Sequence, residues 1–411
     1  MTDDFSSQPY SAAKIALSVS NKNSNTDESN FYLCGMKKLI PFLIILVFQI
    51  SCRKNPDVSE GSVRANNSIK YAQGLRIEKF IGYSIIKIRD PWPGSTESYT
   101  YICKKKNGIV PDSLSRYPII NVPLSSIAVT STTHIPPLEV LGVSDRLTGF
   151  PNLDYISSEV VRKRIDQGKI KDISSGANLN NEIVIDIAPD VVIGHGIDNK
   201  NPSLENLRKS GLTVIFNGDW NEKSPLGNAE WIKLFGTLFG LESKADSIFL
   251  AIENEYHLAQ ALVANVETRP TVLSGALYEN TWFLPQGNSW GSLLVKDAGG
   301  KYLWAETKGS GSLALPFEQV LEKAANADFW IGPAEHQSLA GMLESNSHYA
   351  QFKAFKNKNV YSFSTKKGKT GGVIYYELSQ SRPDLVLKDL IKILHPELLP
   401  EYQLVFFEKL K

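Results

Sequence analysis

Three histidines, His134, His195 and His336, each follow a run of apolar residues with the length and composition of a buried strand. Glu335 directly precedes the last of them. Neutral imidazole and carboxylate groups are common ligands of zinc and iron, so these four side chains form one candidate site for a bare transition metal. No His-X-His or His-Glu-X-X-His spacing supports such a cluster. The spacing instead favours the alternative, in which each histidine is a hydrogen-bonding loop residue.

Aromatic side chains are the second candidate for chemistry. The stretch WFLPQGNSW, residues 282–290, places Trp282, Phe283 and Trp290 beside proline and glycine, which is typical of a loop. Aromatic rings give a large contact area at a low entropy cost, so they suit a flat or bulky ligand. Packing in the core is the other explanation for these rings.

Two further candidates lie near the C-terminus. Tyr375 and Tyr376, like the histidines, are able to ligate a haem iron. The segment KKGKTGG, residues 366–372, resembles a phosphate-binding loop but has Phe363 where the first glycine is required. Its lysines can attract an anionic chelate, or the segment can be a solvated hairpin-like loop.

The composition limits the number of domains and the class of partner. The chain has 411 residues, 42% of them hydrophobic, which is enough for two domains with separate cores. The net charge is +1, and no basic stripe suggests binding to nucleic acid. The sequence shows neither a metalloprotease nor a dinucleotide-binding motif. An α/β enzyme acting on a small ligand therefore remains only the second alternative.

The sequence of the N-terminal region predicts targeting signals rather than a folded domain. Residues 36–51 have a basic start and a short apolar run, and Cys52 follows as in a lipoprotein signal, although Gln49 stands where leucine is usual. We expect Cys52 to be lipidated, which would anchor the protein to the cell envelope on the periplasmic side. Residues 1–35 are interpreted as an upstream extension, and residues 52–70, poor in apolar groups, as a flexible tether. Cys103, in the strand-like YTYICKKK, is expected to be a half-buried strand residue.

Strands and helices alternate twice along the rest of the chain, which predicts an α/β protein with two lobes. The N-terminal lobe covers residues 71–225, of which residues 71–120 form an antiparallel β addition. Residues 226–266 are rich in helix formers and are broken once near Gly240. The C-terminal lobe covers residues 267–411. We expect two Rossmann-like lobes with mostly parallel sheets, joined by one long helix.

One phrase is repeated in both lobes. NLNNEIVIDIAPDVVIGHG begins at residue 178, and LPFEQVLEKAANADFWIGPAEH begins at residue 315. Each contains a glutamate at the start of a helix, Glu182 or Glu318, followed by a buried strand. A carboxylate in the first turn is favoured by the helix dipole, but that effect does not explain its recurrence in both lobes.

The stretches NNEIVIDIAPDVVIG, LPFEQVL, SIAVTSTTHIPPLEVLG and LLVKDAGGKYL together resemble the iron-chelate and cobalamin periplasmic binding proteins of ABC importers. These are class III substrate-binding proteins, in which a rigid helix joins two lobes. The resemblance implies a monomer that binds an iron-siderophore, haem or cobalamin between the lobes, and no cofactor of its own. It also implies that Glu182 and Glu318 dock on a dimeric permease.

The same resemblance places the ligand loops after the strands. In the N-terminal lobe these are Thr132, Thr133, His134, Phe150, residues 176–178, His195, Asp219 and Trp220. In the C-terminal lobe they are Tyr278, Trp282, Phe283, Gln286, Asn288, Trp290, residues 310–312 with Ser312, Glu335, His336, Tyr375 and Tyr376. Cobalamin-binding relatives carry aromatic rings at the sites matching His195 and Ser312, so cobalamin is the less favoured ligand.

Overall fold

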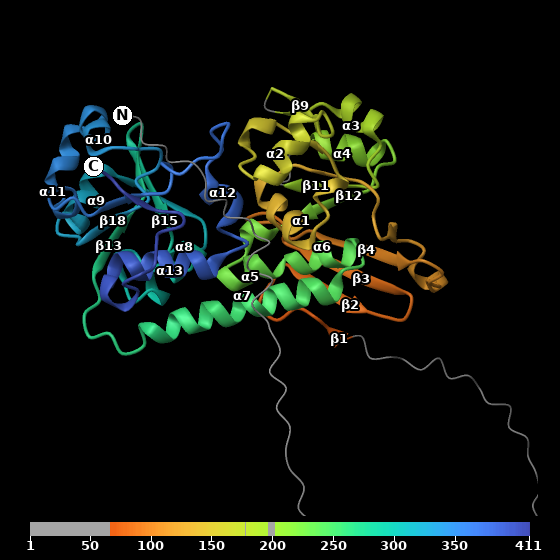
Figure 1. Cartoon of the computed structure of the whole chain (residues 1–411), viewed down its shortest axis with the longest axis horizontal. Coiled ribbons are helices and arrows are strands. Elements are labelled where there is room, and N and C mark those ends of the chain that lie inside the picture. The colour runs from red at the N-terminus through yellow and green to blue at the C-terminus, as the bar shows by residue number, and fades with distance from the viewer. Residues whose placement is uncertain (1–65, 177, 196–201) are drawn as a thin grey trace, which may run out of the picture. The chain divides into compact units, whose positions relative to one another are not determined.

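The computed structural model describes residues 66–176, 178–195 and 202–411 (Figure 1). The predicted signal peptide, Cys52 and the upstream extension lie outside these residues. The described residues form three five-stranded sheets; two of them are largely parallel with helices packed against them, and the third is the β addition. Within the described residues, no helix is both long and apolar enough to cross a membrane.

The first sheet has the strand order β12-β11-β6-β7-β8, and all of its pairs are parallel. Its strands are β6 (Ile127–Val129), β7 (Leu147–Phe150), β8 (Lys171–Asp172), β11 (Val191–His195) and β12 (Val214–Asn217). The connecting helices are α1 (Ile135–Leu141), α2 (Glu159–Asp166), α3 (Asn181–Ile187) and α4 (Pro202–Lys209). A small ribbon, β9 (Ser174–Ser175) with β10 (Asn178–Leu179), precedes α3.

The second sheet has the order β16-β13-β18-β19-β20 and is parallel except for β20. Its strands are β13 (Thr271–Ser274), β16 (Lys301–Tyr302), β18 (Phe329–Ile331), β19 (Val360–Ser362) and β20 (Glu408–Lys409). Its helices are α8 (Trp290–Asp297), α9 (Phe317–Ala324), α10 (Leu339–Ser345), α11 (Lys353–Lys356), α12 (Ile374–Leu378) and α13 (Pro383–Leu394). The predicted alternation of strand and helix is therefore present in both lobes.

A three-stranded antiparallel sheet interrupts the second lobe. It consists of β14 (Ala276–Tyr278), β15 (Thr281–Pro285) and β17 (Ser312–Pro316). Residues 271–277, TVLSGAL, have the composition of a single strand, but Gly275 divides them into β13 and β14. Gly275 has a φ of +78°, and a β-carbon there would collide with the Phe283 carbonyl. Only glycine allows this close approach of the backbones.

The connection between the lobes is a run of three helices, α5 (Pro225–Glu230), α6 (Ile232–Leu238) and α7 (Glu242–Leu262). Gly240, at the predicted break, has a φ of +66°. With 21 residues, α7 is about 31 Å long. Phe249 and Ile252 on its first half belong to the N-terminal core, while Tyr256 and Ala259 belong to the C-terminal core. One helix is thus embedded in both lobes, and Figure 1 shows it running along both.

The β addition is a sheet of β1 (Asn66–Asn67), β2 (Leu75–Lys79), β3 (Tyr83–Arg89), β4 (Ser98–Lys105) and β5 (Ile119–Val122). The prediction of a purely antiparallel sheet is wrong, because β4 and β5 are parallel. Its inner face shares a core with α6 and α7. Cys103 on β4 is fully buried with a free thiol, so it is more deeply buried than expected.

The end of the predicted tether belongs to the fold. The Glu230 carboxylate is fully buried and accepts hydrogen bonds from the backbone N–H groups of Lys70 at 2.9 Å and Tyr71 at 2.6 Å. Ile69 is buried in the N-terminal core. A tether running to residue 70 is therefore wrong at its end, since a buried carboxylate and an apolar side chain fix residues 69–71.

Candidate functional site

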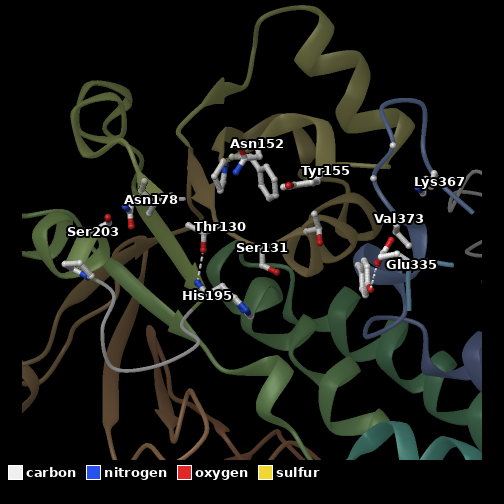
Figure 2. Close-up of a pocket in the computed structure, with 18 residues that line it drawn as sticks. Thr130, Ser131, Asn152, Tyr155, Asn178, His195, Ser203, Glu335, Lys367 and Val373 are labelled. Carbon is white, nitrogen blue, oxygen red and sulfur yellow. Dashed lines mark hydrogen bonds between the residues drawn. The ribbon is translucent and has the colours of Figure 1, made fainter. Parts of the chain in front are cut away.

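A cavity of about 820 Å³ lies at the carboxyl ends of β6, β7 and β11, and the C-terminal lobe supplies its opposite wall. Figure 2 shows Thr130, Ser131 and His195 on one side and Glu335, Lys367 and Val373 on the other. We call it the polar cavity, because eight of its 18 lining residues carry a hydroxyl or a side-chain amide group. Its lining residues are Thr130, Ser131, Thr132, Phe150, Pro151, Asn152, Tyr155, Asn178, Leu179, His195, Pro202, Ser203, Glu335, Lys367, Gly371, Gly372, Val373 and Tyr376.

The N-terminal wall is fixed by hydrogen bonds between strand ends. The backbone N–H of His195, at the end of β11, donates to the Thr130 Oγ1 atom at 2.7 Å (Figure 2). Ser131 accepts a hydrogen bond from the Thr133 backbone N–H at 3.3 Å and so caps the short 3₁₀ helix η3 (Thr132–His134). These bonds hold the polar groups of two loops in one place.

The C-terminal wall is a loop that ends in α12. Lys367 and Val373 form an antiparallel bridge, so the lysine-rich segment is a hairpin, and Lys367 lines the cavity. The Tyr376 hydroxyl donates to Glu335 Oε1 at 3.1 Å. Gly372 passes so close to the Tyr155 carbonyl that a side chain would collide there. The loop that the sequence left open between two interpretations is thus both a hairpin and a cavity wall.

This loop is bound to the opposite lobe at residues 154–158. The buried Glu377 carboxylate accepts hydrogen bonds from the backbone N–H groups of Ser157 at 2.6 Å and Ser158 at 3.0 Å, at the start of α2. Thr370 Oγ1 donates to the Asp154 carbonyl at 2.8 Å. Burial raises the pKa of Glu377 to about 7. We call this set of contacts the inter-lobe contact; it closes one side of the cavity.

The histidines do not assemble into a metal site. Within the described residues, no three His, Cys, Asp or Glu side chains gather as metal ligands. His134 is fully buried under η3, 6.0 Å from the Phe235 ring, and neither ring nitrogen has a hydrogen-bond partner. His336 packs against Tyr349 in the C-terminal lobe at 5.8 Å. The alternative set of His134, His195, Glu335 and His336 therefore does not form a metal site within the described residues.

His195 alone among the histidines lines the polar cavity. Burial lowers its pKa, and burial lowers the pKa of His134 further. Both rings are consequently neutral at physiological pH, so the N-terminal wall carries no imidazolium charge.

A second cavity of about 370 Å³ lies where the C-terminal lobe meets Trp220. It brings together four predicted ligand residues, Trp220, Trp290, Ser312 and Tyr375. Trp220 also lies 5.6 Å from the His195 ring, measured between ring centroids, so it stands next to the polar cavity. Phe150, His195 and Tyr376 line the polar cavity. Their roles in ligand binding stay predictions.

Other predicted ligand residues are placed elsewhere. Trp282 is fully buried against Trp330 at 5.2 Å, and its indole N–H donates to the Ser274 carbonyl at 3.0 Å. Its surroundings looked like a loop, but β15 carries it into the core. Tyr278 and Phe283 are 70% and 42% exposed on the small sheet and line neither cavity.

Three of the predicted polar residues stabilise loops instead of lining a cavity. Thr133 is buried and donates to the equally buried Asp219 at 3.2 Å. The Gln286 side chain accepts a hydrogen bond from the Gly311 backbone N–H at 3.1 Å, and the Asn288 backbone N–H donates to the Gly309 carbonyl at 3.0 Å. These residues hold the loops that line the two cavities.

Sequence reasoning missed several lining residues, among them Asn152, Tyr155 and Ser203. Asn152 follows β7 with a φ of 55°, a conformation that asparagine tolerates better than most residues. A strand followed by Pro-Asn was the available signal. Tyr155 and Ser203 belong to connections whose course the sequence does not reveal.

The chain also contains a sequence motif that is typical of a catalytic serine. Gly287–Gly291, GNSWG, matches the nucleophile elbow Gly-X-Ser-X-Gly. In the structure Ser289 caps α8: its hydroxyl donates to the Gln286 carbonyl at 2.6 Å and accepts from the Ser292 N–H at 3.2 Å. The side chain is thus engaged in capping, and no histidine activates it among the described contacts.

The two repeated glutamates occupy matching positions. Glu182 lies in the first turn of α3 and Glu318 in the first turn of α9, and both are exposed. Neither is enclosed in a core, which their predicted docking role requires. That role itself stays a prediction.

Comparisons with known proteins agree with this geometry. A sequence profile of the family described as periplasmic binding protein matches residues 127–366, more than half of the chain. An uncharacterized lipoprotein of Methanocaldococcus jannaschii is 26% identical over 91% of this chain and 97% of its own length. A second uncharacterized lipoprotein of that organism is 26% identical over 61% of this chain and 64% of its own length.

Solved structures show the same fold at low identity. A periplasmic haem-binding protein from Pseudomonas aeruginosa superposes with a TM-score of 0.53 at 15% identity, covering 70% of this chain and 98% of that chain. The CeuE protein of Helicobacter pylori, in a complex with nickel and histidine, superposes with a TM-score of 0.52 at 21% identity, covering 68% of this chain and 86% of that chain. The two-lobed arrangement is therefore shared with these proteins.

Proposed function

Because the chain belongs to the periplasmic binding protein family, we propose that it captures a metal chelate between its lobes and delivers it to an ABC importer. The observation that carries this proposal is the polar cavity of about 820 Å³, whose walls come from both lobes. Its volume falls within the range of roughly 300–1,000 Å³ common for small-molecule sites. No second function is favoured by a specific observation.

The lining favours a polar chelate of low net charge. Lys367 and Glu335 are the two formally charged residues of the lining, and their charges are opposite. Glu335 already accepts a hydrogen bond from Tyr376. Hydroxyl and amide groups supply the remaining polarity, and His195 is neutral. Such a surface suits an iron-siderophore complex, while haem and cobalamin remain the other candidates. The similar structures described as binding haem or nickel support a metal-containing cargo.

Delivery would involve both lobes. Glu182 and Glu318 are exposed at equivalent helix starts, where they would pair with basic residues on the two halves of a permease. An isolated surface ion pair contributes little binding energy, but two separated pairs define an orientation. Lipid attached to Cys52 would hold the protein at the membrane, near the permease.

The test is to purify the protein from its own cell envelope and record native mass spectra and absorption spectra. A bound mass with a ferric charge-transfer band identifies an iron-siderophore, a Soret band identifies haem, and a corrin spectrum identifies cobalamin. Protein that carries no such mass and binds none of the three classes on titration would refute the proposal.

A further inference from the structure

The second cavity differs in chemistry from the polar one, and we call it the aromatic chamber. It extends from the cleft into the C-terminal core and is walled by Trp290, Phe363, Tyr375, Phe407, Val386 and Leu390. Protein interiors are close-packed and rarely leave spaces much larger than a water molecule. A space of about 370 Å³ that reaches these core side chains is large enough to admit part of a ligand.

The rings give the chamber a preferred guest shape. The Phe363 and Tyr375 rings are stacked at 4.4 Å with an interplanar angle of 16°, and Trp290 lies 6.5 Å from Tyr375 at 22°. The Phe363 and Trp290 rings thus each lie nearly parallel to the Tyr375 ring. A flat ring that enters beside them can stack in the offset geometry that aromatic pairs prefer.

The charges of the lining disfavour an anionic guest. Glu222 is the one acid among the lining residues, and no lysine, arginine or histidine lines the chamber. The Glu222 carboxylate already accepts hydrogen bonds from the Gln73 N–H at 2.8 Å, the Gly74 N–H at 2.9 Å and the Trp231 indole at 3.0 Å. An anionic guest would lose its hydration without gaining a counter-ion.

The chamber and the polar cavity adjoin at Trp220. Trp220 lines the chamber, and its ring lies 5.6 Å from the His195 ring of the polar cavity. The loop of residues 310–312 also lines the chamber, and Gln286 holds it through two hydrogen bonds with Gly311, at 2.9 and 3.1 Å. A molecule held in the polar cavity can thus extend an arm past Trp220.

We propose that the aromatic chamber binds an uncharged aryl arm of the cargo, so that the protein selects chelates that carry such an arm. This inference rests on the proposed function. The chamber is more than twice the size of a cavity of roughly 150 Å³ that holds benzene, so it accommodates a two-ring group. Tyr375 lines the chamber, so its hydroxyl can hydrogen-bond with a polar atom on the arm.

The chamber is tested directly with 2-naphthol, an uncharged two-ring probe, on the full chain. Gly291 lines the chamber, and a β-carbon there would meet only Pro285, at 3.5 Å. Gly291→Leu therefore fills the chamber, while Gly291→Ala is the matched control with the same change of backbone. We expect G291L to weaken 2-naphthol binding at least ~10-fold and G291A to stay within ~2-fold of the wild type.

Melting temperatures report whether both variants fold. Unchanged 2-naphthol affinity in a folded G291L protein would refute the chamber as an aryl site, and so would a wild type that does not bind 2-naphthol. If G291L does not fold, a crystal of the wild type soaked with 6-bromo-2-naphthol decides, since the bromine must lie between Trp290 and α13.

Selection of the cargo is tested with a matched pair of chelates, the ferric complexes of benzohydroxamate and acetohydroxamate, which differ in phenyl against methyl. We expect the phenyl complex to bind at least ~10-fold more tightly to the wild type, and this preference to vanish in G291L. If both bind equally, the inference fails and the proposed function stands. If neither binds although 2-naphthol does, the chamber stands and capture of such chelates fails.

Discussion

The two lobes share a repeated phrase but contribute different chemistry to the cleft. The N-terminal lobe presents hydroxyl, amide and imidazole groups at the ends of β6, β7 and β11. The C-terminal lobe presents the rings of the aromatic chamber and a glycine-rich loop that is hydrogen-bonded to the other lobe. Both lobes nevertheless expose a glutamate at the same place, Glu182 on α3 and Glu318 on α9.

The positions that match between the lobes and the positions that differ have different physical explanations. The positions that match between the lobes lie on exposed helix starts, where a two-fold partner would require like contacts. The positions that differ line the cleft, where one ligand without internal symmetry contacts both walls. The duplicated phrase is thus explained by the proposed partner, and the divergence at the strand ends by the proposed cargo.

The largest expected effect concerns the matching glutamates. Glu182→Arg combined with Glu318→Arg should reduce uptake to background, because each reversed charge would face a basic residue of the permease. Affinity for the chelate should stay within ~2-fold, since neither residue lines a cavity. Uptake of labelled chelate by cells and titration of the purified protein measure the two quantities.

The matched control reverses two acids one helical turn further along the same helices, Asp186→Arg with Glu322→Arg. Both are exposed like the glutamates. Uptake should survive in this control. Equal loss in both double variants would show that general charge, rather than these two positions, governs docking.

The next largest effect concerns the C-terminal wall of the polar cavity, which Glu377 attaches to the N-terminal lobe. Burial raises its pKa from 4.5 to about 7, so its protonated form is favoured in the folded protein. The stability gained in this way is complete below the unfolded pKa and is lost as the pH rises through the folded pKa. Between pH 5 and pH 8, the free energy of unfolding should fall by about 2 kcal/mol more in the wild type than in Glu377→Gln.

Urea denaturation at both pH values measures this difference. Asp219, whose pKa burial raises to about 6, titrates in both proteins, and Glu139, which accepts a hydrogen bond from Ser158 Oγ, faces Glu377 in both. Thr370→Val loosens the same contact without removing an ionisable group, so its pH profile should run parallel to that of the wild type. Parallel profiles for E377Q as well would contradict a titrating Glu377 in the contact.

A smaller effect is expected at the N-terminal wall. Thr130→Val keeps the shape of the side chain but removes the oxygen that accepts the His195 N–H. The loss of one hydrogen bond should cost about 1 kcal/mol of stability and, by releasing the end of β11, weaken chelate binding ~5-fold. Thr148→Val removes the hydrogen bond to the Ile127 carbonyl outside the cavity, so it should cost similar stability at unchanged affinity. Equal affinities in both variants would show that the His195 loop does not depend on Thr130.

The sequence predicts the lobes better than their cleft, for a physical reason. Apolar runs such as VVIG and helix ends such as Gly142 and Gly211 act locally, so the alternation of strand and helix could be read from them. Trp282 shows the limit of local signals. Its neighbours Pro285 and Gly287 indicate a loop, but pairing of β15 with β17, some thirty residues away along the chain, turns its ring into the core.

The inter-lobe contact was not predictable for the same reason. Glu377 accepts a hydrogen bond from Ser157, which lies 220 positions away in the chain, and neither segment has a sequence feature that predicts this contact. The lysine-rich loop, in contrast, was recognised from its composition, but composition left its role open. The structure places Lys367 at the polar cavity. A substitution of this lysine is therefore the last test, and we expect it to have the smallest effect.

Lys367→Gln should weaken binding of an anionic chelate only ~2-fold, because an exposed charge is screened by solvent and salt. The effect should shrink further as the salt concentration rises from 50 to 500 mM, and a neutral chelate should not respond. Lys369→Gln in the same hairpin is the matched control, since Lys369 is exposed but does not line the cavity. An effect of ~10-fold or more that persists in high salt would mean that Lys367 contacts the ligand directly, and the C-terminal wall would then be polar in function as the N-terminal wall is.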